Sequence, residues 1–165
     1  MRAPNQAQHK TGHFTSYLRR TIHELATDLA IQIADVRFAR QSVRMDHETL
    51  AKFLSGTLTS EALVDEIDAE VASCNESVRA GEPGYIAISN GLRFEVNRQS
   101  ARRLLEALAN GRLPIETASY VAHCIIMSDD FEFTDDAVRD AIFFAADDAS
   151  PPSRDETLRA LTALD

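Results

Sequence analysis

The feature that most constrains this chain is a series of amphipathic helical segments, each separated from the next by capping residues, glycine or proline. From residue 14 to about residue 44, apolar residues recur every three or four positions, which predicts one long helix or two helices in line. The same spacing predicts helices over about 46–54, 60–78, 97–109, 114–126, 134–146 and from 153 onward. We therefore expect a mainly α fold of the α+β class.

Helix-capping signals set the expected boundaries. Asp46 is a predicted N-cap, and Gly56 stands where a left-handed residue commonly ends a helix. Asn97 and Thr134 are predicted N-caps of two later helices, because their short polar side chains can accept a hydrogen bond from the first turn. The final helix begins with a capping box that joins Ser153 to Glu156.

One segment carries a β signal. Two apolar-rich runs, residues 85–89 and 92–96, flank the dipeptide Asn90-Gly91. This dipeptide is typical of a type I′ turn, in which both central residues need positive φ. The sequence therefore predicts one antiparallel β-hairpin near residues 85–96, packed on the helices because a lone hairpin is only marginally stable.

The length of 165 residues suits a single domain. Residues 1–13 are polar, contain Pro4 and Gly12, and are expected to form a loose tail, followed by one mainly helical domain over 14–165. An alternative exists for residues 29–44, since ADVRF at 34–38 resembles NGLRF at 90–94. If the two segments are duplicates, residues 29–44 form a second hairpin instead of helix.

The two cysteines, Cys74 and Cys124, indicate a reducing compartment. They form no CxxC pair, and a disulfide-stabilised fold would need more of them. We expect both to be free thiols that bind no metal. The N-terminal residues lack the apolar run of a signal peptide, and no apolar stretch is long enough to cross a membrane. These features predict a cytoplasmic protein without membrane association.

Motifs that carry catalysis or cofactor binding are absent from the sequence. No GxGxxG, GxxxxGK[ST], HExxH or GxSxG pattern occurs, and the five histidines have no ligand spacing. His123 and Cys124 are adjacent, but neighbouring residues of a helix point about 100° apart, which separates a thiol from its base. We therefore expect no cofactor, no metal and no catalytic residue, although a paired-carboxylate site could remain hidden in the sequence.

The net charge is −9, and most of the acidity lies at the C-terminal end. Residues 113–165 contain twelve Asp and Glu against three Arg. Such a surface repels nucleic-acid phosphates and attracts a basic protein. The alternative is that the acidic residues serve only as a solvated, solubilising surface. The predicted partner-binding residues are Asp129, Asp130, Glu132, Asp135, Asp136, Asp140, Phe143, Asp147 and Asp148.

Phe143 distinguishes this surface from a merely solvated one. On the helix over 134–146, residues such as Val138 and Ile142 define the core face, whereas Asp136, Asp140 and Phe143 fall on the opposite face. An aromatic side chain among carboxylates fits an interface anchor with electrostatic steering around it. Alternatively, another helix covers Phe143 and the acidic residues are simply solvated.

The C-terminal part resembles the small acidic immunity proteins encoded beside bacterial polymorphic and contact-dependent inhibition toxins. The similar features are a helix ending in GRL, an ASYVA helix, the link DFEF and an acidic helix ending in ADD, together covering about residues 97–150. Immunity proteins are diverse, so the resemblance implies no particular fold and transfers no site residue. It implies a non-catalytic inhibitor that binds one cognate toxin, often a nuclease, and blocks its active site or substrate surface.

The sequence thus predicts a protein-binding inhibitor that neutralises a basic partner through residues around 129–148. The alternative is a helical regulatory or scaffold subunit that acts by homo-oligomerisation, supported by Ile31 and Phe38 on the far face of the long N-terminal segment. A steep salt dependence of partner binding favours the inhibitor, whereas concentration-dependent self-association favours the subunit.

Overall fold

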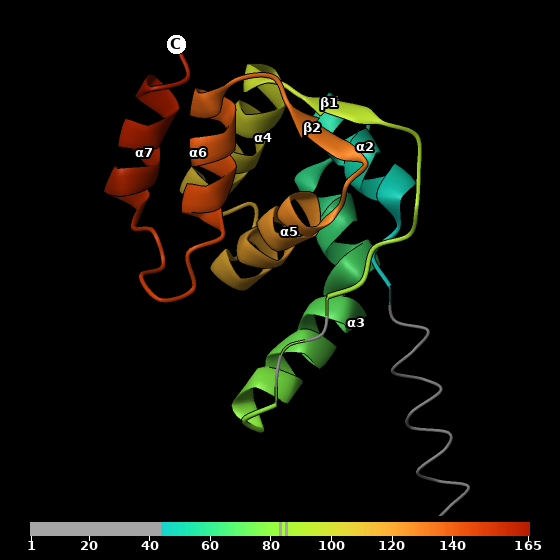
Figure 1. Cartoon of the computed structure of the whole chain (residues 1–165). Helices are drawn as coiled ribbons and strands as arrows, with labels where there is room; N and C mark the ends of the chain where they lie inside the picture. Colours follow the sequence, from blue (N-terminus) through green and yellow to red (C-terminus); the bar gives the residue numbers. More distant parts are fainter. Residues whose placement is uncertain (1–43, 83, 85) are drawn as a thin grey trace, which may run out of the picture. The chain divides into compact units, whose positions relative to one another are not determined.

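A computed structural model describes residues 44–82, 84 and 86–165. The tail and the long helix predicted before residue 44, and the alternative hairpin over 29–44, lie outside the described residues apart from Arg44. The described part is mainly helical with a small sheet, so the predicted α+β class is confirmed (Figure 1). In chain order its elements are α2 (His47–Ser55), α3 (Ser60–Arg79), β1 (Phe94–Val96), α4 (Arg98–Ala109), α5 (Ile115–Met127), β2 (Phe131–Phe133), α6 (Asp136–Ala145) and α7 (Arg154–Thr162).

Local capping chemistry sets the helix boundaries largely as the sequence predicts. The Asp46 side chain accepts the backbone N–H of Thr49 at 2.9 Å, and Gly56 ends α2 at φ 85°. Asn97 caps α4, and the capping box at the start of α7 is present. The predicted cap Thr134 is wrong by one residue, because Asp135 caps α6 while the backbone N–H of Thr134 donates to the carbonyl of Val96.

Helix α5 is the central element of the core. Eight of its thirteen residues are buried, and α3, α4 and α6 pack against it. Its apolar character is therefore explained by contacts on several sides, as expected for a buried helix. The largest fully buried side chains elsewhere are Phe53, Met45, Leu50, Leu54, Leu63, Ile67, Leu104, Leu105, Leu113, Ile142 and Val96.

The predicted hairpin is wrong. Strand β1 pairs in parallel with β2, with Phe94 opposite Phe131 and Val96 opposite Phe133, and Ile88 forms a parallel bridge to Met45. Neither Asn90 nor Gly91 has the positive φ that a type I′ turn requires. The two apolar runs instead satisfy their backbone groups with distant segments, and the two-stranded sheet lies beside α2 in Figure 1.

Gly91 is required by close packing. The side chain of His47 is buried, with 5% exposed, and its ring stacks on Phe131 at a centroid distance of 4.6 Å. A Cβ atom on Gly91 would lie 2.0 Å from the Nδ1 atom of that ring. The backbone N–H of Gly91 donates to the Asp130 carboxylate at 3.0 Å, and Ser89 accepts the backbone N–H of His47 at 2.8 Å. The loop before β1 is therefore fixed onto α2 and onto the turn before β2.

Two arginines join helix ends across the fold. The Arg103 guanidinium of α4 donates to the carbonyl of Leu54 at 2.5 Å, near the end of α2. Arg154 of α7 donates to the carbonyl of Ala109 at 3.1 Å, at the end of α4. Each cation thus satisfies a helix carbonyl that has no partner within its own helix. Among the described residues, no helix is both long and apolar enough to span a membrane.

Candidate functional site

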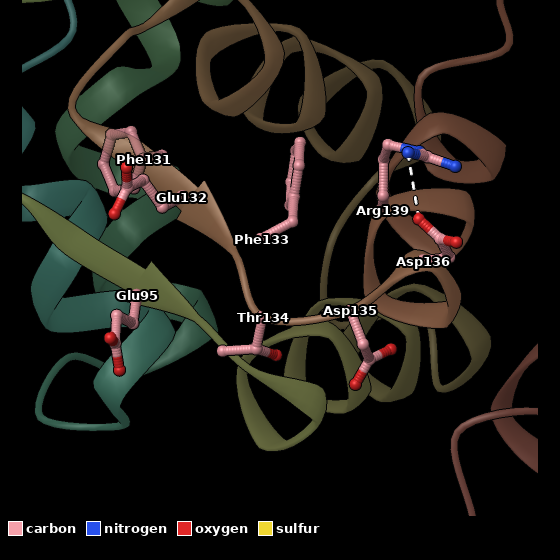
Figure 2. A pocket seen from close by; sticks show the side chains of 8 residues that line it. All are labelled: Glu95, Phe131, Glu132, Phe133, Thr134, Asp135, Asp136 and Arg139. Carbon is pink, nitrogen blue, oxygen red and sulfur yellow. Dashed lines mark ion pairs between the residues drawn. The ribbon is translucent and has the colours of Figure 1, made fainter.

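The acidic C-terminal region contains an open groove between the sheet and α6. It has a volume of about 660 Å³, and Figure 2 shows its walls. Strand β2 and the turn after it form one side, and the first turns of α6 form the other. The lining residues are Glu95, Phe131, Glu132, Phe133, Thr134, Asp135, Asp136 and Arg139.

Strand alternation explains how carboxylates come to face the groove. Val96 and Phe131 turn inward and are buried, whereas Glu95 and Glu132 are exposed. These two glutamates are register partners in the parallel ladder, so like charges stand side by side on the outer face of the sheet. Glu95 was not among the residues predicted for this surface. Sequence reasoning missed its place beside Glu132, because that depends on the non-local pairing of β1 with β2.

Arginines flank the groove carboxylates other than Glu95. Arg93 pairs with Glu132 at 3.1 Å, and Arg98 pairs with Asp135 at 3.0 Å. The Arg98 side chain, together with the backbone N–H of Val138, holds the pKa of Asp135 below its ordinary value. All of these side chains remain well exposed, so the pairs contribute little to stability. They nevertheless reduce the local negative charge that a partner would meet.

The outer face of α6 continues the acidic surface beyond the groove. Phe143 is 50% exposed, as its position on the helix predicts, and none of the other helices that the structure describes covers it fully. Asp140 lies one turn before it, and Arg139 approaches Asp136 at 3.0 Å and Asp140 at 3.6 Å. Asp147, one turn after Phe143, accepts the backbone N–H groups of residues 149 and 150 and so shapes the turn that follows α6.

The remaining predicted residues lie apart from the groove lining. Asp130 accepts the backbone N–H of Gly91 and holds two loops together, whereas Asp129 has no hydrogen bond or ion pair to any described residue. Asp148 accepts a hydrogen bond from the Ser119 hydroxyl and lies 3.8 Å from the Nε2 atom of His123. Asp148 thereby ties the loop between α6 and α7 to α5, a structural contact that sequence reasoning did not foresee.

The Ser119, His123 and Asp148 cluster contains the residue types of a hydrolytic triad but not its geometry. In a triad, the serine hydroxyl donates to histidine, and the carboxylate orients the histidine from its other nitrogen. Here the Ser119 hydroxyl donates to Asp148 itself, and it lies 3.4 Å from the Nδ1 atom of His123. That Nδ1 atom is closer, at 3.0 Å, to the backbone carbonyl of Ser119. A ring nitrogen that bonds to a carbonyl oxygen carries its own proton, so in this arrangement Nδ1 does not accept the proton of the Ser119 hydroxyl.

The two cysteines are free thiols in the structure, as predicted. Burial raises the pKa of Cys124 to about 12 and also raises the pKa of the half-buried Cys74. The thiolate, which is the reactive form, is therefore scarce at neutral pH at either position. Within the described ranges, no group of three or more His, Cys, Asp or Glu side chains is placed to hold a metal ion.

Comparison with protein-family models, with curated proteins and with solved structures finds no match for this chain. The resemblance to immunity proteins consequently remains a hypothesis that rests on residues 97–150 alone.

Proposed function

We propose that this protein is a non-catalytic, protein-binding inhibitor that neutralises a basic partner, in the manner of an immunity protein acting on a cytoplasmic toxin such as a nuclease. The observation that carries the proposal is the half-exposed Phe143 on the outer face of α6, with Asp140 one turn before it and Asp147 just beyond the end of the helix. An aromatic ring left in water among carboxylates contributes little to the core, but it provides what a charged interface needs at its centre.

The two parts of this surface act at different stages of binding. Burial of an aromatic anchor at a hot spot can contribute about 2 kcal/mol or more, chiefly by slowing dissociation. The surrounding carboxylates attract a basic partner over the screening length of about 8–10 Å, which raises the association rate. Asp136 and Asp140 have highly exposed side chains, so their field reaches solvent despite the nearby Arg139.

Binding kinetics test the proposal once a partner has been captured from the native host. Phe143→Ala should speed dissociation roughly tenfold or more, because the anchor is lost. Leu158→Ala on α7 is the matched control, since Leu158 is also an exposed large apolar residue. Asp140→Lys should slow association, most clearly at low salt, whereas Asp68→Lys on α3 makes the same change of charge elsewhere.

The inhibitory role is tested separately, by measuring the activity of the captured partner. The captured partner should be basic, and the full chain should suppress its activity, for example nucleic-acid cleavage, at equimolar concentration. A partner whose dissociation responds equally to Phe143→Ala and Leu158→Ala would refute the binding surface. A bound partner that remains fully active would refute the inhibitory role.

The alternative function, a homo-oligomerising subunit, rests on Ile31 and Phe38, which lie outside the described residues. Sedimentation of the full chain over a range of concentrations distinguishes the two functions, because only the subunit should self-associate with rising concentration.

A further inference from the structure

The edge of β1 that faces away from β2 has backbone groups without a partner. On the β2 side, the backbone N–H of Phe94 donates to the carbonyl of Asp130, and the carbonyl of Val96 accepts from Thr134. Backbone groups of successive residues point to opposite sides of a strand, so the N–H and C=O groups of Glu95 point away from β2. They form no hydrogen bond to any described residue. Strand β1 therefore presents an open edge to which an extended chain can add.

A largely apolar groove, here called the edge groove, runs beside this open edge. It has a volume of about 510 Å³, and its walls are the first turns of α2, with Glu48 and Ala51, and residues 90–94. Of the residues that the structure describes, none from β2 lines it. The edge groove therefore lies on the side of β1 that faces away from β2.

Two features of the edge groove indicate that a further group binds there. Leu92 is 88% exposed, which makes it the most exposed large apolar side chain of the described residues, and it lies beside the half-buried Phe94 and Ala51. His47 also lines the edge groove and is only 5% exposed, yet its Nε2 atom has no hydrogen-bond partner. Buried polar atoms nearly always have a partner, so this nitrogen is an observation independent of the open edge.

Charge and strand alternation indicate which segment fits. Glu95 is exposed and its carboxylate has no ion pair to a described residue, whereas Arg93 is already paired with Glu132 at 3.1 Å. A residue directly opposite Glu95 on an added strand would have its Cβ about 4.5–5.5 Å away, where a basic side chain is favourable. Phe94 alternates with Glu95 and lines the edge groove, so the neighbours of that basic residue would face the edge groove, where apolar side chains fit. Glu95 and Asp136 also line the groove beside α6, so the open edge is continuous with the proposed acidic surface.

We propose that the open edge of β1 receives an extended segment of the basic partner, in which a lysine or arginine opposite Glu95 alternates with an apolar residue seated in the edge groove. The segment pairs with β1 as a third strand, so that backbone hydrogen bonds provide affinity and the edge groove provides specificity. The inference rests on the proposed function and deepens it by stating the conformation and the residue pattern of the partner's contact segment.

The first test uses the full chain and a fluorescein-labelled octapeptide in which lysine and valine alternate, with binding followed by fluorescence anisotropy at low salt. Two matched peptides carry N-methyl groups on the backbone, one on its lysine amides and the other on its valine amides. Both keep the side chains and the charge of the parent peptide. Strand pairing in either direction uses the N–H groups of alternate residues only, so one of the two should lose affinity by about tenfold or more while the other changes less than about threefold.

Matched variants of the protein isolate the N–H donor of the edge. Glu95→Thr and Glu95→Pro both remove the carboxylate, but only proline also removes the backbone N–H, which the ladder with β2 does not use. Glu95→Pro should therefore bind the parent peptide about fivefold or more weakly than Glu95→Thr. Leu92→Ala should weaken binding about two- to fivefold, whereas Leu158→Ala on α7 should change it less than about twofold. Circular dichroism verifies that each variant is folded, and the methylated peptides decide the question if Glu95→Pro is not.

Three results would overturn the inference. The first is an equal loss of affinity, or no loss, with the two methylated peptides, because general charge attraction predicts that result. The second is no measurable binding of the parent peptide by the unaltered protein. The third is self-association of the unaltered protein that Glu95→Pro abolishes and Glu95→Thr retains, since the edge would then belong to a second copy of the chain.

The inference and the proposed function can fail separately. If Phe143→Ala speeds dissociation of the captured partner while the two methylated peptides bind equally, the open edge is wrong and the proposed function stands. If only one methylated peptide loses affinity while Phe143→Ala leaves the captured partner unaffected, the proposed surface on α6 is wrong.

Discussion

Replacing Gly91 with alanine tests the packing that displaces the expected hairpin. The new Cβ atom would lie 2.0 Å from Nδ1, 2.2 Å from Cγ and 2.5 Å from Cε1 of the buried His47 ring. All three distances are much shorter than a van der Waals contact. Phe131 stacks on the same ring, so the ring cannot simply turn aside. Overpacking of this kind costs about 1–3 kcal/mol. A loss of about 2 kcal/mol corresponds to a fall in Tm of about 4–8 °C for a chain of this length.

A double-mutant cycle assigns the cost to the ring. We expect Gly91→Ala to lower the free energy of unfolding by about 2 kcal/mol in the unaltered protein, but by less than about 0.5 kcal/mol in the His47→Ala background. The measurement is urea denaturation followed by far-UV circular dichroism, with midpoints and slopes fitted together. Gly81→Ala is the control, because Gly81 has φ 76° and no atom within 4 Å of an added Cβ. Its cost should be about 1 kcal/mol in either background.

The reasoning would be refuted if Gly91→Ala cost the same with and without the His47 ring. A type I′ turn predicts that result, since its penalty arises from positive φ and is independent of His47. A stabilising effect of Gly91→Ala in the unaltered protein would also contradict the close packing.

Three further predictions concern local contacts. The Thr49 amide holds the pKa of Asp46 below its ordinary value. A carboxylate whose pKa is lower in the folded than in the unfolded state stabilises the fold at neutral pH, and this stability is lost as the pH falls through the folded-state pKa. Urea denaturation at pH 7 and pH 3 should therefore show a steeper loss for the unaltered protein than for Asp46→Asn. Iodoacetamide at pH 8 should leave Cys124 unmodified until urea unfolds the chain, because the pKa of this thiol is about 12. Rapid labelling of Cys124 in the folded protein, read by mass spectrometry, would contradict this. Gly56→Ala should destabilise by about 1–2 kcal/mol, because Gly56 has φ 85° and an added Cβ would meet the Arg103 guanidinium; a thermal melt with unchanged Tm would count against it.

The sequence predicts helix ends well here because capping depends on residues only three or four positions apart. Asp46, Asn97 and the capping box of α7 each satisfy amides in their own first turn, so no tertiary contact is needed to recognise them. The Asn90-Gly91 signal is equally local, but it is overridden by packing against His47, which is remote in sequence. Tertiary contacts routinely override turn propensity in this way.

The same difference between local and non-local contacts decides which parts of the candidate site could be predicted. The exposure of Phe143 follows from helical periodicity within a single helix, so it could be predicted. The position of Glu95 beside Glu132 could not, because it requires the pairing of strands separated by α4 and α5. The structural use of Asp148 was missed for a similar reason, since its partner Ser119 lies on a different element.

The parallel pairing of β1 with β2 has a consequence for the order of folding. These strands can meet only after the chain between them has formed α4 and α5 and returned to the same edge. The chain therefore loses the conformational entropy of closing a long loop before any hydrogen bond forms between the two strands. A hairpin at residues 85–96 would instead have formed early, from neighbours in the chain. The ladder is therefore expected to be nearly absent from the folding transition state, and truncation of Val96 should accelerate unfolding much more than it slows folding. The groove beside this ladder would then be among the last parts of the molecule to assemble.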